Sequence, residues 1–142
     1  MKKLQSFRTA LLTASEDLTR NPEKTSIFAD NGRVVAGGAP GKGFEYHYQA
    51  IAIIQEFAGD VDAVSAAILG WMAAELPGVL MNPEKADKAF RFEVEVLNGE
   101  QCDLQITVEV EEPVVPADDG SFTHPAAPLL DLTGDWQWPV TS

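Results

Sequence analysis

Residues 44–60 read FEYHYQAIAIIQEFAGD, and the rest of the chain can be placed around this stretch. Its first half alternates aromatic with polar side chains, which is the pattern of a strand with one buried face. Its second half is an apolar run, 50–54, which predicts cover on both faces, and Gly59-Asp60 ends it. The stretch exceeds the usual strand length of about 5–6 residues, so we expect it to form the centre of a sheet.

Two segments carry apolar residues at helical spacing. The first predicts an amphipathic helix over residues 4–19, ended by Asn21-Pro22, from a stripe made of Leu4, Phe7, Leu11, Ala14 and Leu18. The second helix is expected to begin after Asp60, a good N-cap, and to end at Pro77-Gly78. The tetrapeptide Asn-Pro-Glu-Lys occurs at both 21–24 and 82–85, where Asn capping and Pro at the first helical position explain it as turn chemistry.

The clearest sheet signal lies at residues 89–112. Two runs with strict apolar and polar alternation flank Asn98-Gly99, a typical hairpin turn, and the hairpin has one apolar and one acidic face. Shorter strand signals at 26–28 and 33–37 flank Asn31-Gly32 and predict a second hairpin there. The glycine-rich residues 37–43 lack the spacing and the Lys-Ser/Thr pair of a phosphate loop, so we expect a loop between strands.

These elements predict an α+β fold with a mixed, mostly antiparallel sheet of four to five strands and two helices packed on one face. We place the folded domain at residues 1–115 and an extended C-terminal arm at 116–142. Five prolines after Glu112 argue against regular structure in the arm. Trp136 and Trp138 predict that the arm docks, either on its own domain or on a neighbouring subunit.

Charge is distributed unevenly along the chain. Residues 1–91 hold all ten Lys and Arg with eleven carboxylates, whereas residues 92–142 hold eleven carboxylates and no base. The chain therefore lacks a basic patch in its second part, and binding to nucleic acid through phosphate neutralisation is not expected. An acidic surface of this kind repels DNA or attracts a basic protein. No apolar run reaches about 18 residues, which argues against a membrane span.

The residue pattern offers no catalytic constellation. His47 and His124 have no second ligand at metal spacing, and Cys102 falls on the apolar face of a strand, where it reads as a core residue in a reducing compartment. Asp60 and Asp62 are interpreted as helix capping, and Glu93 and Glu95 as strand alternation on a solvated face. We therefore expect that the protein is not an enzyme and that it binds neither a cofactor nor a metal.

Several motifs in order resemble the tail completion protein R family of contractile-tailed temperate phages. They are GRVVAGG, FEYHY, FAGDVDAV, NPEK and FRFEVEVLN, and the likeness runs from about Ser6 to about Val115. The resemblance implies a structural protein of the virion tail and neck, made in the host cytoplasm, either in a phage or in a tail-like bacteriocin. It also implies a homo-oligomer, expected to be a hexameric ring, that contacts tail tube and sheath proteins and the head-side connector or neck proteins, with DNA only passing through its channel.

Nine residues are the candidates for interface or channel-lining positions: Arg33, His47, Arg91, Glu93, Glu95, Glu109, Glu111, Trp136 and Trp138. A subunit of a closed ring needs two different contact patches, and the acidic hairpin face and the arm are the two candidates. The alternative function is a free acidic binding module, such as an assembly chaperone or a DNA-mimic inhibitor.

Overall fold

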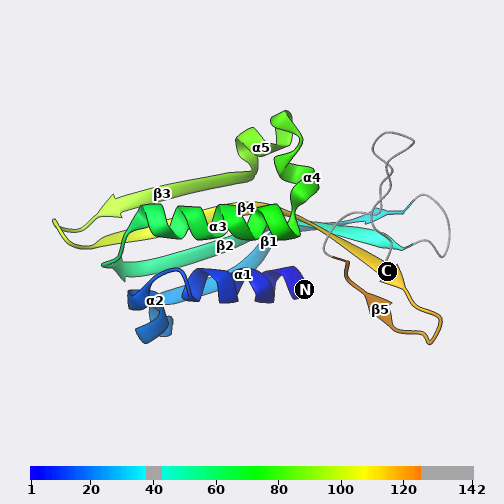
Figure 1. Ribbon diagram of the computed structural model, residues 1–142, viewed down its shortest axis with the longest axis horizontal. Coiled ribbons are helices and arrows are strands. Elements are labelled where there is room, and N and C mark those ends of the chain that lie inside the picture. The colour runs from blue at the N-terminus through cyan, green and yellow to red at the C-terminus, as the bar shows by residue number, and fades with distance from the viewer. Residues whose placement is uncertain (38–42, 126–142) are drawn as a thin grey trace.

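A computed structural model describes residues 1–37 and 43–125 and shows a curved sheet with helices across one face (Figure 1). The strands are β1 (Thr25–Ala36), β2 (Phe44–Phe57), β3 (Phe90–Val96), β4 (Cys102–Pro116) and β5 (Phe122–Thr123). The helices are α1 (Lys2–Leu12), α2 (Glu16–Arg20), α3 (Val61–Glu75), α4 (Pro77–Leu80) and α5 (Pro83–Ala89), with one 3-10 turn at Pro22–Lys24. The predicted α+β class is confirmed.

Strand β2 occupies the centre of the sheet, as its sequence predicted. The strand order is β1-β2-β4-β3, the pairs of described strands are antiparallel, and β5 pairs with the end of β4. The longest pairing joins β2 to β4, where Tyr48 lies opposite Val110 and Ile54 lies opposite Leu104. Two central strands of 14 and 15 residues therefore carry the fold.

The core lies between the sheet and helices α1 and α3. Side chains of alternate β2 residues point to the helices, and Ala50, Ala52 and Ile54 are fully buried there. From the helix side Phe7 and Trp71 meet with ring centroids 5.2 Å apart. Burial of each large apolar side chain contributes about 1.5–3 kcal/mol, so this layer supplies most of the driving force for folding.

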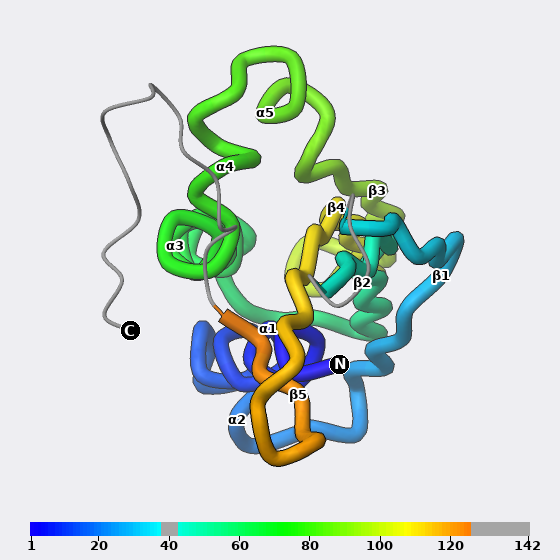
Figure 2. The backbone as a smooth tube through the Cα atoms, turned by 90° about the vertical axis from the view of Figure 1, so that its right-hand side faces the viewer, coloured from blue at the N-terminus to red at the C-terminus, as the bar shows by residue number. Residues whose placement is uncertain are grey.

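Helices α1 and α3 lie on one face of the sheet, and on the opposite face no described helix covers the second half of β2 (Figure 2). The second half of the central strand was predicted to be covered on both faces, and the described residues supply no second layer here. Ile51 is still buried on this face, because Phe28 and Thr107 stand opposite it on the two neighbouring strands. An apolar run in a wide sheet can be shielded by its cross-strand neighbours rather than by a second layer.

Two expected elements differ from the structure near the N-terminus. The helix expected over 4–19 is two helices, because α1 ends at its C-cap Thr13 and Ser15, the N-cap of α2, is extended. The Thr13 amide and hydroxyl both donate to the Thr9 carbonyl, which completes the last turn of α1. The hairpin expected at Asn31-Gly32 is a bulge inside the single strand β1, where Asn31 adopts a positive φ of 51°.

The predicted second helix and the predicted β3–β4 hairpin are confirmed. Helix α3 begins after Asp60, whose carboxylate accepts a hydrogen bond of 2.9 Å from the Asp62 amide. Asn98 stabilises the β3–β4 turn by accepting from the amides of Glu100 and Gln101. Residues 38–42 lie outside the described residues, and Gly37 and Gly43 at their ends are joined by a backbone hydrogen bond of 3.1 Å.

The prolines after Glu112 do not end the sheet. Strand β4 continues through Pro113 to Pro116, and the chain then turns back so that Thr123 pairs with Val115. Val108 lies opposite Phe90, the first residue of β3, so beyond Val108 only β2 among the described strands borders β4 until β5 pairs with it. A proline is tolerated on such a half-free strand because its missing N–H can face away from the partner.

Candidate interaction surface

Seven of the nine candidate residues lie on the uncovered face of the sheet. Strand register puts Arg33 opposite His47, and His47 opposite Glu111, so the three form one row across β1, β2 and β4. The His47 Nε2 atom lies 2.8 Å from Glu45 Oε1, and its Nδ1 atom lies 3.4 Å from an Arg33 guanidinium nitrogen and 4.0 Å from Glu111 Oε2. Trp136 and Trp138 fall outside the described residues.

Two of the four predicted hairpin glutamates are paired with bases. Glu109 accepts from the Arg91 guanidinium at 2.9 Å and from the Gln49 side-chain amide at 3.0 Å. Glu111 accepts from the Lys85 ammonium group at 2.7 Å. The bases come from α5 and the start of β3, which lie beside β4. This half of the face is therefore close to neutral rather than acidic.

A pocket of about 290 Å³ lies between α5 and the part of the sheet that holds His47, Glu109 and Glu111. Its floor is partly apolar and its rim holds Lys and Arg together with carboxylates. It is lined by Asn31, Arg33, His47, Tyr48, Gln49, Val79, Glu84, Lys85, Lys88, Glu109, Val110 and Glu111. Asn82 caps α5 by accepting from the Glu84 and Lys85 amides, and the Lys85 side chain in this first turn donates to Glu111.

Glu93 and Glu95 lie apart from the pocket, toward the turn of the β3–β4 hairpin. They stand opposite Gln105 and Asp103 in the strand register, and both are exposed. No ion pair joins either of them to a base among the described residues. The sequence-predicted acidic face is thus confined to this end of the hairpin.

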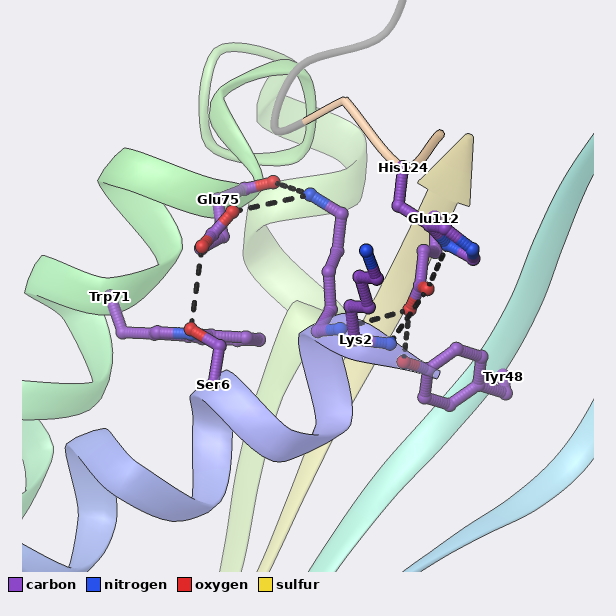
Figure 3. A network of polar contacts seen from close by, with 8 residues as sticks. Lys2, Ser6, Tyr48, Trp71, Glu75, Glu112 and His124 are labelled. Carbon is purple, nitrogen blue, oxygen red and sulfur yellow. Dashed lines mark hydrogen bonds and ion pairs between the residues drawn. The ribbon is translucent and has the colours of Figure 1, made fainter. Parts of the chain in front are cut away.

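A second polar cluster lies under the sheet, at the start of α1 (Figure 3). Glu112 is fully buried and accepts four hydrogen bonds or close polar contacts. The donors are the Tyr48 hydroxyl at 2.8 Å, the Lys2 and Lys3 backbone amides at 3.0 and 3.2 Å, and the His124 ring, whose Nδ1 lies at 2.7 Å. The carboxylate thereby satisfies free amides at the N-terminus of α1, where the helix dipole favours negative charge.

The protonation behaviour of this cluster follows from these contacts. Burial alone would raise the pKa of Glu112, but the hydrogen bonds from Tyr48, His124 and the two backbone amides outweigh burial and hold that pKa below its ordinary value. Burial and the nearby Glu112 charge raise the pKa of the Tyr48 hydroxyl, which therefore stays protonated as a donor. The cluster contains one buried negative charge with a full set of donors.

The same cluster extends along α1 toward α3. The Lys3 ammonium group donates to the Glu75 backbone carbonyl and lies 3.6 Å from its carboxylate, while the Ser6 hydroxyl bridges Glu75 and the Trp71 ring nitrogen (Figure 3). Burial lowers the pKa of Lys3, and the charges of Glu75 and Glu112 oppose that shift. These contacts hold α1 against α3 and β4, so the role of the cluster is to stabilise the fold.

Sequence reasoning missed two parts of these sites. Glu112 occupies the phase of β4 that otherwise holds apolar residues, from Leu104 to Val110, and an acidic residue in a buried phase was the available signal. The approach of Lys85 to Glu111 depends on where α5 lies, which no local pattern specifies. In the described residues no group of three or more His, Cys, Asp or Glu side chains is arranged to hold a metal ion. The described helices also include none with the length and apolar character needed to cross a membrane.

Comparison with known proteins identifies the family. The family model for P2 phage tail completion protein R (GpR) matches residues 1–128, which is wider than the likeness at 6–115 suggested by the motifs. Tail completion protein R of Escherichia phage P2 is 31% identical over 112 residues, covering 79% of this chain and 72% of the relative. No solved structure matches. The chain belongs to the P2 phage tail completion protein R family.

Proposed function

We propose that this protein is a structural virion protein that completes a contractile phage tail by forming a hexameric ring at its head-proximal end. The ring would join the tail tube and sheath to the neck proteins, with DNA passing through its channel. The observation that carries this proposal is the family match over residues 1–128, together with the relative named for tail completion.

The structure supports an assembly role in two ways. First, the described helices leave most of one face of the sheet uncovered, and the two outer strands, β1 and β3, each have one edge with no described partner. A subunit of a cyclic ring needs two different surfaces, one for each neighbour, and the two sides of this sheet differ in sequence and charge. Second, the hairpin end with Glu93 and Glu95 offers no positive charge, so DNA that passes it has no attractive contact.

Charge reversal separates the two halves of the predicted acidic face. We expect the Glu93→Lys/Glu95→Lys double variant to fold normally, because both side chains are exposed, but to assemble poorly. Glu109→Lys/Glu111→Lys would instead place new ammonium groups beside Arg91 and Lys85, and we expect lower stability as well. Thermal unfolding combined with particle yield distinguishes the two effects. Unchanged particle yield and infectivity for both variants would contradict a role of this face in the virion.

Complementation of a null phage tests the tail role directly. Electron microscopy of lysates that lack the protein should show tails that are abnormal at the head-proximal end or fail to join heads, and the supplied wild-type chain should restore them. Sedimentation of the lysate then distinguishes the alternative function. A protein that remains free while particles sediment, and whose absence leaves tails normal, would favour an acidic chaperone or inhibitor.

Of the two docking modes predicted for the arm, on its own domain or on a neighbour, we propose the second, with Trp136 and Trp138 as contacts to a neighbouring subunit. Removal of residues 126–142 leaves β5 and His124 in place, so this truncation tests the tryptophan-bearing segment without disturbing the Glu112 cluster. We expect the truncated protein to form a weaker oligomer, and an equally stable oligomer would count against the predicted contact.

A further inference from the structure

Strand β3 is an edge strand of the sheet, and its outer backbone has no partner strand in the part of the chain that the structure describes. It pairs with β4 through Phe90–Val96, and no described strand lies on its other side (Figure 1). Residues 91–96 are all exposed. At roughly 3.3 Å per residue the free edge is about 23 Å long, enough for another extended segment to add to the sheet.

One side of β3 is apolar and exposed. Phe92 is 64% exposed and Val96 is 73% exposed, although Ile106, opposite Phe92 on β4, is buried beneath the helices. The side chains of Val94 and Leu97 are also exposed. A flat apolar edge of this kind promotes aggregation unless a partner covers it, so the strand has the properties of an interface.

The other side of β3 is acidic, and this limits the partner. Glu93 and Glu95 project from it beside Asp103 on β4, and the chain contains no Lys or Arg after Arg91. Of the three bases that precede Glu93 most closely along the chain, Arg91 and Lys85 are paired with Glu109 and Glu111, and Lys88 lines the pocket beside α5. In the register that places Glu93 opposite Glu95, antiparallel pairing of β3 with the β3 strand of a second copy would bring these carboxylates together, which is destabilising. Registers that place Arg91 opposite them would require Arg91 to leave Glu109.

We propose that β3 is a docking edge for an extended segment of another protein in which apolar residues alternate with Lys or Arg. Such a segment would pair its backbone with β3, place its apolar side chains against Phe92, Val94 and Val96, and direct its basic side chains to Glu93 and Glu95. We assign this partner to the tail proteins, and that assignment rests on the proposed function. The docking edge itself does not depend on it.

Synthetic peptides test the docking edge on the full-length chain. The probe is a labelled nine-residue peptide that alternates Lys and Val, and the comparison peptides have alternating Glu and Val or the same Lys and Val residues in two blocks. We expect fluorescence anisotropy to show binding of the alternating basic peptide alone. Methylation of alternate backbone nitrogens on its pairing edge should abolish binding, because strand addition requires those N–H groups.

Matched variants locate the binding site. Glu93→Lys/Glu95→Lys and Phe92→Thr/Val96→Thr should each weaken binding roughly tenfold or more, which is about 1.4 kcal/mol. Glu23→Lys/Asp118→Lys makes the same charge change at exposed positions elsewhere, and Phe28→Thr/Val34→Thr removes exposed apolar side chains from β1 at the other edge. These control variants should keep nearly full affinity.

Three results would overturn the docking edge. The first is that the block peptide binds as tightly as the alternating basic peptide. The second is that the control variants lose as much affinity as the β3 variants. The third is that a chain lacking residues 126–142 binds the peptide much more tightly than the full-length chain, which would mean that this segment already occupies β3. Isolated tails provide the separate test of the partner. If the peptide results hold but Glu93→Lys/Glu95→Lys binds tails as the wild type does, the docking edge stands and its assignment to a tail protein fails.

Discussion

The carboxylate of Glu112 accepts a hydrogen bond of 3.2 Å from the backbone amide of Lys3, which lies 109 residues earlier in the chain. The contact joins the end of β4 to the first turn of α1, and Tyr48 and His124 complete the donors around the same carboxylate. The start of the domain and the chain segment that follows β4 are therefore held by one buried charge.

Removal of the Glu112 charge should destabilise the domain. Glu112→Ala leaves the Tyr48 hydroxyl and the first amides of α1 without their acceptor, and we expect a loss of about 3 kcal/mol in the free energy of unfolding. Glu112→Gln keeps the shape and one acceptor oxygen, so its loss should be smaller. Urea denaturation measures both variants. A Glu112→Leu variant as stable as the wild type would show that the charge contributes nothing.

The lowered pKa of Glu112 predicts an acid-dependent loss of stability. Because the folded-state pKa lies below the unfolded value, near 4.5, the contribution is fully present above that pH. It is lost progressively as the pH falls from there through the folded-state pKa. The free energy of unfolding measured between pH 6 and pH 3 should therefore fall less steeply for Glu112→Gln. Some slope should remain, because hydrogen bonds outweigh burial at Asp17 and lower its pKa too.

Gly59 is required by close packing between α2 and the end of β2. A Cβ atom there would lie 2.6 Å from Ser15 Oγ and 2.7 Å from the buried Phe57 ring. Gly59→Ala should lower the free energy of unfolding by about 1–3 kcal/mol. Gly70→Ala is the control, since no atom lies within 4 Å of its Cβ position in α3, and helix propensity predicts a gain of up to about 1 kcal/mol. Equal effects of the two substitutions on the thermal midpoint would refute this packing argument.

The two Asn-Pro-Glu-Lys segments should respond differently to the same substitution. Asn82 caps α5 as an acceptor, so Asn82→Asp should keep stability while Asn82→Ala loses about 1 kcal/mol. Asn21 instead donates to the Asp17 carboxylate at 3.1 Å, so Asn21→Asp would place two carboxylates together. We expect Asn21→Asp to be the more harmful of the two Asp variants in thermal unfolding. A ranking in the opposite order would show that the identical tetrapeptides do not act through these contacts.

Local patterns predicted most of the architecture. Alternation in β2 and in the β3–β4 hairpin, together with the Asp60 cap, placed the central strand, the hairpin and α3 correctly, because each signal is contained within a few residues. The bulge at Asn31 was not predicted, since Asn-Gly is compatible with both a turn and a bulge in a continuous strand. Only pairing with β2 on both sides of the bulge decides between them.

The candidate surface was predicted in part. Strand alternation was sufficient to place Glu93, Glu95, Glu109 and Glu111 on one face, but not to show that α5 supplies Lys85 to one of them. The Glu112 cluster depends on donors from α1, β2 and the segment after β5, which come together only in three dimensions. Long-range polar contacts of this kind leave no periodic signal apart from the acidic residue in a buried phase.

The mass of the purified protein, measured by light scattering alone and after incubation with isolated tails, tests the tail-completion account most directly. Tail completion by a hexameric ring predicts a species of six 15.4-kDa chains, or a monomer that forms such a ring only on tails. A monomer that neither assembles nor associates with tails would contradict it.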